Sequence, residues 1–282
     1  MLGNYLIGLR EGLEAALVIS ILIAYLVRTE RQHLIPRVWA GVAAAVAISL
    51  AFGALLTFGP RGMEERTEEL IAGSLSLLAV GFVTWMIFWM AGAARALGSQ
   101  LRTSVDAAAE AGKWSLATVA LLAVGREGLE TALFLWAATK AAASGGDSSF
   151  GPLLGAALGL GTAILLGWAI YKGALKINLT KFFTWTGAFL ILVAAGVLAY
   201  AVHEFQEAGV LGGEDDLMFD ISNVMNPDSW YAAVIKGIFN FSPRMSVVQV
   251  LAWVVYAVPV MALFFAKVRR KAPANETVAI DA

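Results

Sequence analysis

The sequence predicts an all-α integral membrane protein with seven transmembrane helices. The chain is 59% hydrophobic with only 15% charged residues, and its mean hydropathy is +0.74. Soluble domains carry about 25% charged residues, and a helix that crosses a bilayer needs roughly 20 mostly apolar residues. The apolar runs of that length cover about residues 4–27, 38–59, 68–93, 114–139, 152–171, 182–202 and 245–266.

The distribution of Lys and Arg predicts the direction of these helices. Segments 28–37, 94–113, 172–181 and 267–271 hold thirteen basic residues, whereas the alternate connecting segments hold five. Cytoplasmic loops of membrane proteins are enriched in basic residues. We therefore expect a protein of the cytoplasmic membrane with its N-terminus outside and its C-terminus in the cytoplasm. The first run lacks the basic start of a cleavable signal and is expected to be a membrane span.

One pentapeptide, Arg-Glu-Gly-Leu-Glu, occurs twice, at Arg10–Glu14 and Arg126–Glu130. The two copies lie in the first and fourth spans, which run in opposite directions. We therefore expect a single domain over residues 1–282, in which about 1–93 and 114–202 form a 3+3 inverted repeat. The remainder is predicted to be an external acidic loop at 203–244, one additional helix at about 245–266, and a disordered tail at 272–282.

The pentapeptide places charged side chains in a membrane span, where such residues are costly and usually functional. Each residue of an α-helix advances about 100°, so the Arg and both Glu of one copy share an arc and the Gly points away from it. Two Arg and four Glu sum to −2, which suits a cation held by carboxylate oxygens. The structural alternative is that each Arg only neutralises its own Glu and holds the bundle together. If the charges are functional, the predicted metal site comprises Glu11, Glu14, Glu127 and Glu130, with Arg10 and Arg126 as ion-pair partners.

Two Arg-Glu-x-Leu-Glu motifs in the first and fourth of seven spans resemble the oxidase-dependent iron transporter (iron permease) family, which includes bacterial EfeU-type permeases. The His-Glu-Phe-Gln-Glu-Ala-Gly segment at 203–209 resembles this family too. The resemblance implies high-affinity import of iron, as Fe2+ or Fe3+, through the motif glutamates, without a prosthetic group. It also implies that separate extracytoplasmic iron-binding or oxidising (peroxidase) proteins serve the permease. An external ion-collecting site is expected at Glu65, Glu68, His203, Glu204 and Glu207.

Other functions remain compatible with the sequence. A different divalent cation, such as manganese, would suit the same carboxylates. A membrane-embedded di-iron enzyme would be expected to use Glu-x-x-His, and neither motif contains His, so a transporter is favoured over an enzyme. A structural subunit of a larger complex is a further alternative. The chain has no Cys, no basic face and no Walker-type phosphate loop, so neither nucleic acid nor ATP is an expected partner.

Overall fold

The structure, a computed structural model of the whole chain, describes residues 2–59, 64–93, 114–143, 150–172, 179–220 and 244–270. Each predicted apolar run coincides with a long helix. Within the described ranges, the helices of at least 22 residues are α1 (Leu2–Arg28), α2 (Ile35–Phe58), α3 (Glu65–Ala93), α5 (Ser115–Ala143), α6 (Phe150–Tyr171), α7 (Leu179–Glu207) and α9 (Val247–Arg270). A short 3-10 helix, η1 (Gln32–Leu34), joins α1 to α2. The predicted tail at 272–282 lies outside the described residues.

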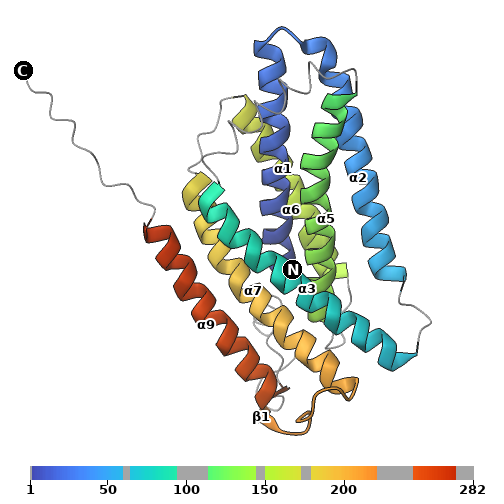
Figure 1. Cartoon of the computed structure of the whole chain (residues 1–282), viewed down its shortest axis with the longest axis vertical. Helices are drawn as coiled ribbons and strands as arrows, with labels where there is room; N and C mark the ends of the chain where they lie inside the picture. Colours follow the sequence, from blue (N-terminus) through green and yellow to red (C-terminus); the bar gives the residue numbers. More distant parts are fainter. Residues whose placement is uncertain are drawn as a thin grey trace, which may run out of the picture.

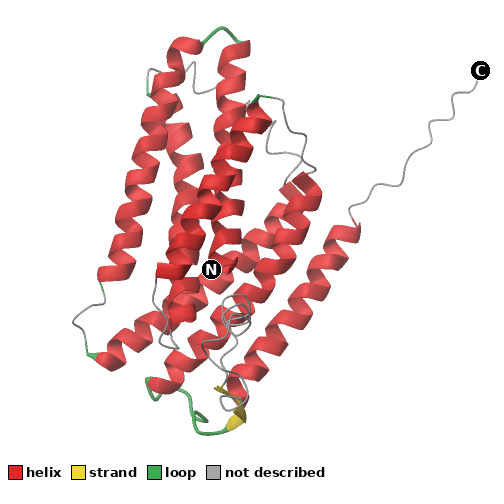
Figure 2. Ribbon diagram, turned by 180° about the vertical axis from the view of Figure 1, so that it is seen from behind, coloured by secondary structure: helices red, strands yellow, loops and turns green. Residues whose placement is uncertain are grey.

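The long helices form two groups (Figures 1 and 2). In the first group α1 packs most extensively on α6, α2 packs on α5, and α1 crosses α5. In the second group α7 packs on both α3 and α9. Contacts between the groups are fewer and come mainly from α3 and α7 against α1 and α5. The motif-bearing helices α1 and α5 therefore lie beside each other where the two groups meet.

Among the described residues, three clusters of buried hydrophobic side chains hold this arrangement, the smallest being Leu9 and Leu13 of α1 with Ala163 of α6. The largest cluster joins the two groups, with Ile7, Val83, Phe134 and Leu190 contributed by α1, α3, α5 and α7. The second cluster lies at the other end of the first group, where α1, α2 and α5 meet around Leu22. The motifs lie along α1 and α5 between the two larger clusters.

Many large apolar side chains face outward. Within the residues that the structure describes, five helices are long and apolar enough to cross a membrane by length and composition: α2, α3, α6, α7 and α9. Helices α1 and α5 have 27 and 29 residues but include the charged motifs. Contiguous exposed apolar surface is rare on soluble monomers, and lipid is its natural neighbour here. The most outward-facing side chains, each at least 67% exposed, include Leu50, Leu122, Leu165, Trp185 and Val255.

Two features of the region after 202 differ from the prediction. Helix α7 continues to Glu207, so His203, Glu204 and Glu207 lie on a helix rather than in the expected loop at 203–244. The expectation of an all-α chain also misses a short antiparallel pair, β1 (Leu217–Asp220) with β2 (Arg244–Ser246). Hydropathy marks where a helix becomes polar, and a helix that leaves the membrane can continue past that point.

A buried polar network fixes the junction of α7, β2 and α9. Gln206 accepts hydrogen bonds from Ser246 Oγ at 3.0 Å and from Gln249 Nε2 at 3.2 Å. Ser246 and Gln249 also exchange backbone-to-side-chain hydrogen bonds, in the reciprocal pattern of a helix capping box. This network explains why α9 begins at Val247, close to the predicted start at 245.

Candidate metal site

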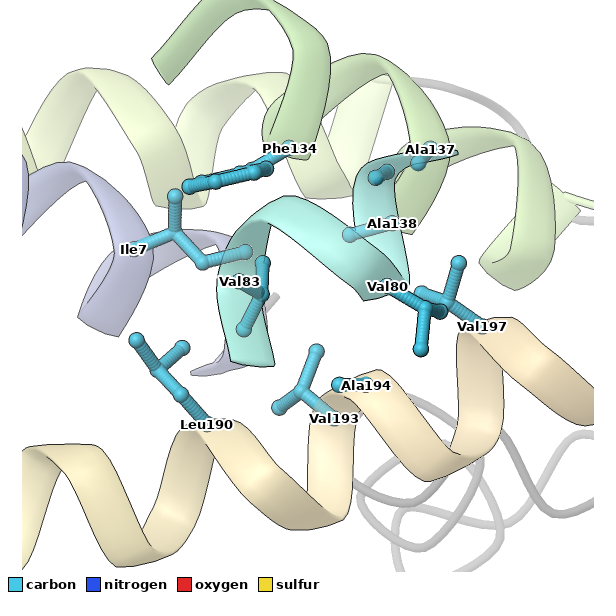
Figure 3. Close-up of a pocket in the computed structure, with 11 residues that line it drawn as sticks. Ile7, Val80, Val83, Phe134, Ala137, Ala138, Leu190, Val193, Ala194 and Val197 are labelled. Atoms are coloured by element: carbon cyan, nitrogen blue, oxygen red, sulfur yellow. The ribbon is translucent and has the colours of Figure 1, made fainter. Parts of the chain in front are cut away.

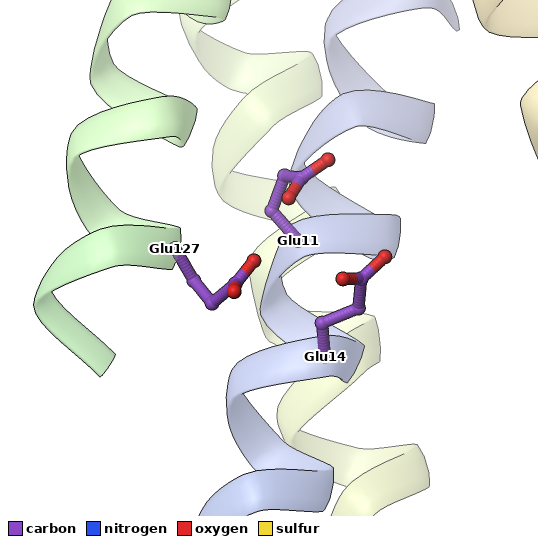
Figure 4. A group of neighbouring side chains, drawn as sticks. All are labelled: Glu11, Glu14 and Glu127. Atoms are coloured by element: carbon purple, nitrogen blue, oxygen red, sulfur yellow. The ribbon is translucent and has the colours of Figure 1, made fainter. Parts of the chain in front are cut away.

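Three of the four predicted metal ligands converge. Glu11 and Glu14 from α1 and Glu127 from α5 each offer a carboxylate oxygen within 4.8 Å of the other two (Figure 4). Hard cations bind carboxylate oxygens at about 2.0–2.6 Å, so a single ion can contact oxygens up to about 5 Å apart. We call these three residues the carboxylate site. Their spacing fits one cation held between the two helices.

The α1 copy of the pentapeptide is enclosed within the protein. Arg10 is 1% exposed and Glu11 is 1% exposed. Arg10 Nη1 lies 3.9 Å from Glu11 Oε1, and Arg10 Nε lies 3.3 Å from Glu14 Oε1. Both oxygens of Glu11, one of Glu14 and two nitrogens of Arg10 nevertheless make no hydrogen bond. Because buried polar atoms are normally paired, this set of unsatisfied carboxylate oxygens is typical of a site that binds a cation.

The α5 copy has a different environment. Arg126 Nε donates a hydrogen bond of 2.9 Å to Glu130 Oε1, and the side chains are 37% and 13% exposed. The Arg126 guanidinium also lies over the rings of Trp89 and Trp85, at 4.7 Å and 5.5 Å from their centroids. Glu130, the fourth predicted ligand, is thus paired with Arg126 and lies outside the group formed by the other three glutamates.

The motif glycines lie at close helix contacts, as predicted from their position opposite the charges. A Cβ atom at Gly12 would lie 2.8 Å from the Cβ of Ala163 on α6. A Cβ atom at Gly128 would overlap the hydroxyl of Ser49 on α2. In each copy, the missing side chain lets the motif helix approach its main packing partner while the charged arc faces the other motif helix.

The residues predicted to collect ions outside gather at the far ends of α3 and α7. A groove of about 400 Å³ is lined by Glu65, Arg66, Glu69, Glu207, Ala208 and Gly209. Beside it, His203 Nε2 lies 3.4 Å from Glu207 Oε1, and the Tyr200 hydroxyl donates to the buried Glu204. Lys140 on α5 lies 3.5 Å from Glu68. We call the carboxylates and imidazole of this region the outer acidic cluster: Glu65, Glu68, Glu69, His203, Glu204 and Glu207.

Glu69, Tyr200 and Lys140 are not among the residues predicted from the sequence, although the structure places them in or against the outer acidic cluster. Glu69 was visible as a neighbour of Glu68 on the same helix. Tyr200 and Lys140 come from other helices, and only the packing of α5 and α7 against α3 brings them here.

An apolar layer lies along the helices between the outer acidic cluster and the carboxylate site, and Figure 3 shows its side chains. It encloses a cavity of about 20 Å³, which is room for roughly one water molecule. The layer precedes the motif on both motif helices. On α5, Ala137 and Phe134 lie between Lys140 and the motif, and on α1, Ile7 lies one turn before Glu11. The layer consists of Ile7, Ala79, Val80, Val83, Phe134, Ala137, Ala138, Leu190, Val193, Ala194 and Val197.

Comparison with known proteins identifies the family. Residues 1–273 match the iron permease FTR1 family. The chain belongs to this family. The members of this family are permeases rather than enzymes. The chain is a multi-pass membrane protein, because five helices of its described part are suited to spanning a bilayer.

Its relatives include proteins named "Ferrous iron permease EfeU". One from Escherichia coli O6:K15:H31 is 38% identical over 277 residues, covering 97% of this chain and 99% of the relative. Another from Yersinia pestis is 37% identical over 264 residues, covering 93% and 92%. The similarity therefore extends over nearly the full length of both chains. No solved structure matches the fold.

Proposed function

We propose that this permease imports iron across the cytoplasmic membrane through the carboxylate site formed by its two Arg-Glu-Gly-Leu-Glu motifs. The observation that carries the proposal is the convergence of Glu11, Glu14 and Glu127, from two helices, within 4.8 Å. Both oxygens of Glu11 and one of Glu14 are buried without a hydrogen bond, and such oxygens are suited to a hard cation. Ferrous iron, named for the relatives, fits the net charge of three carboxylates and Arg10, which is −2.

The packing of the helices supports an inverted repeat of α1–α3 and α5–α7. In such a repeat α1, α2 and α3 are equivalent to α5, α6 and α7. The α1–α6 contact is then equivalent to the α5–α2 contact, and both are extensive. The contacts of α1 with α5 and of α3 with α7 map onto themselves. In transporters of this kind the substrate lies near the membrane midplane, between the repeats. The carboxylate site lies between α1 and α5, the first helices of the two proposed repeats.

The predicted orientation in the membrane gives the direction of transport. With the N-terminus outside, the outer acidic cluster faces the extracytoplasmic side and the α1–α2 turn, with Arg28 and Arg31, faces the cytoplasm. A groove lined by carboxylates raises the local concentration of cations. Separate extracytoplasmic iron-binding or oxidising proteins would deliver iron to this groove. Glu130 lies one turn, about 6 Å, beyond Phe134 of the apolar layer, and Glu11 lies one turn beyond Ile7, so these are the first motif carboxylates that an incoming ion meets.

The apolar layer keeps the carboxylate site closed to the outer side. A cavity of about 20 Å³ cannot admit a hydrated ion, and the layer offers no oxygen ligand to replace the lost water. Iron can therefore pass only when α3 and α7 move away from α1 and α5 at the apolar layer. Contacts between the two groups are fewer than those within them, which makes this interface the natural place for such a movement.

The central test is iron uptake by cells that express Glu127→Gln. This change preserves shape and removes the carboxylate that α5 brings to the site, so iron uptake should be abolished. Glu30→Gln, an exposed carboxylate in the α1–α2 turn, is the matched control and should transport normally. Both proteins should reach the membrane in equal amounts. Normal uptake by Glu127→Gln would contradict the assignment.

A competition assay decides between iron and other divalent cations. Radioactive iron is presented to proteoliposomes with its oxidation state fixed by a reductant or a chelator, and unlabelled manganese is added in excess. An iron permease should keep most of its uptake. Strong inhibition by manganese, with manganese itself transported, would assign the same site to a broader divalent-cation transporter.

The chain contains no Cys, so single cysteines can report whether the apolar layer is closed. Val193→Cys lies in the layer, and Thr67→Cys is an exposed reference at the start of α3. A membrane-impermeant thiol reagent added outside should modify Val193→Cys at least about tenfold more slowly, because its thiol is buried in apolar surroundings. Equal rates in the absence of iron would mean that the layer is open.

A further inference from the structure

Two tryptophans of α3 hold the arginine of the second motif. Trp85 and Trp89 are one turn apart, with ring centroids 6.5 Å from each other and planes inclined by 27°. The Arg126 guanidinium lies over both rings, 4.7 Å from the Trp89 centroid and 5.5 Å from that of Trp85. Its Nε donates to Glu130. Arg126 is therefore fixed by contacts with α3 and with its own helix.

The first motif shows what the same arginine does without this restraint. Arg10 has only a distant aromatic neighbour among the described residues, Phe183, at 6.0 Å. Its guanidinium lies within ion-pair distance of both motif glutamates, Glu11 and Glu14. The pentapeptide geometry thus allows its arginine to approach the glutamate that follows it. Arg126 makes no such ion pair with Glu127 in the described part of the chain.

This difference decides the charge that iron encounters. Arg10 contributes +1 to a site with three carboxylates, giving −2, whereas Arg126 and Glu130 form a neutral pair beside it. If Arg126 turned towards Glu127 as Arg10 turns towards Glu11, the charge at the site would become −1. A cation would then compete with a tethered guanidinium for one of its ligands.

We propose that Trp85 and Trp89 are positioning residues that hold Arg126 away from Glu127 and so keep the carboxylate site at a charge of −2. They act through Arg126 and do not touch the ion. A guanidinium over an indole face is stabilised by the ring quadrupole and by stacking. The inference deepens the proposed function and rests on it, because the charge matters only if iron binds at Glu11, Glu14 and Glu127.

The test is the equilibrium binding of Fe2+ to the purified, detergent-solubilised protein under anaerobic conditions. Trp89→Leu releases Arg126 and should raise the Kd by roughly tenfold, which corresponds to about 1.4 kcal/mol. Trp89→Phe retains an aromatic face and should stay close to the wild-type Kd. Trp185→Leu is the matched control, because Trp185 is 72% exposed on α7 and should leave the Kd unchanged.

A double-mutant cycle separates positioning from packing. Arg126→Gln removes the competing charge, so in that background Trp89→Leu should have no further effect on the Kd. If Trp89→Leu raises the Kd equally with and without Arg126, or if Trp89→Phe is as weak as Trp89→Leu, the tryptophans act through packing and the inference is wrong. Unchanged binding in Trp89→Leu also overturns it. Unchanged binding and uptake in Glu127→Gln would instead overturn the proposed function.

Discussion

The two copies of Arg-Glu-Gly-Leu-Glu have the same sequence and different surroundings. In the α1 copy Leu13 is fully buried and Arg10 is 1% exposed, whereas in the α5 copy Leu129 and the side chain of Arg126 are each 37% exposed. The α1 copy is surrounded by α5, α6 and α7. The α5 copy lies at the edge of the bundle, against α2 and the tryptophans of α3. Neighbouring helices, rather than the motif itself, thus determine which charges are enclosed.

In a transporter built from an inverted repeat, such a difference between equivalent elements has a functional meaning. Alternating access moves one repeat relative to the other around a fixed site. A copy that is enclosed and a copy that is partly open are what one conformation of such a protein should display. In the proposed route, the apolar layer closes the path from the outer acidic cluster, while the side chain of Arg126 in the α5 copy remains 37% exposed.

The largest expected difference between the copies concerns their arginines. Arg10→Gln leaves buried carboxylates without a counter-charge, and breaking a buried ion pair in this way costs about 3–5 kcal/mol of folding free energy. Arg126→Gln removes a partly exposed partner, for which about 1 kcal/mol is expected. Thermal unfolding of the purified variants in detergent measures both. Equal losses would show that the two copies are equally enclosed.

The leucines give the next largest difference. Leu13→Ala should create a cavity between α1 and α6, beside Leu9 and Ala163, and cost about 2–5 kcal/mol, since Leu13 is fully buried. The equivalent Leu129→Ala should cost less than about 1 kcal/mol, because Leu129 is 37% exposed. The same unfolding assay applies. A large loss in Leu129→Ala would indicate that another element covers the α5 copy.

Much of this architecture could be predicted from the sequence, because hydropathy and charge are local properties. Each apolar run coincides with a long helix of the described part of the chain, and helical periodicity placed Gly12 and Gly128 opposite the charges. The environment of each copy could not be predicted, since identical pentapeptides carry identical local information. Periodicity indicates which residues share a face, but it does not identify the helix that covers that face.

The same limit explains why the candidate site was only partly foreseen. Glu11, Glu14 and Glu127 converge as the matched motifs suggested, while Glu130 is diverted to Arg126. The guanidinium of Arg126 also lies over Trp85 and Trp89, which are about 40 residues away on α3. In the sequence, these tryptophans are indistinguishable from others that face lipid. Contacts between helices distant in the chain carry the missing information.

The glycines should give the smallest difference, because both lie at tight helix contacts. Alanine at Gly12 would press against the Cβ of Ala163 at 2.8 Å, a methyl group with no freedom to rotate away. Alanine at Gly128 would meet the Ser49 hydroxyl, which can rotate if it gives up its hydrogen bond to the Ala45 carbonyl, and the Ser49 Cβ at 3.0 Å. Each substitution should cost about 1–3 kcal/mol, with Gly12→Ala the more severe.

Second substitutions distinguish these contacts from a loss of backbone flexibility. Ala163→Gly removes the obstructing methyl and should restore most of the stability lost in Gly12→Ala. Ser49→Ala removes the hydroxyl but keeps the Cβ, so it should restore Gly128→Ala only in part. Unfolding temperatures of the two double variants, compared with those of the single ones, give the result. If neither partner substitution restores stability, the glycines are required for local unwinding of the motif helices, and the close helix contacts are not the reason for their presence.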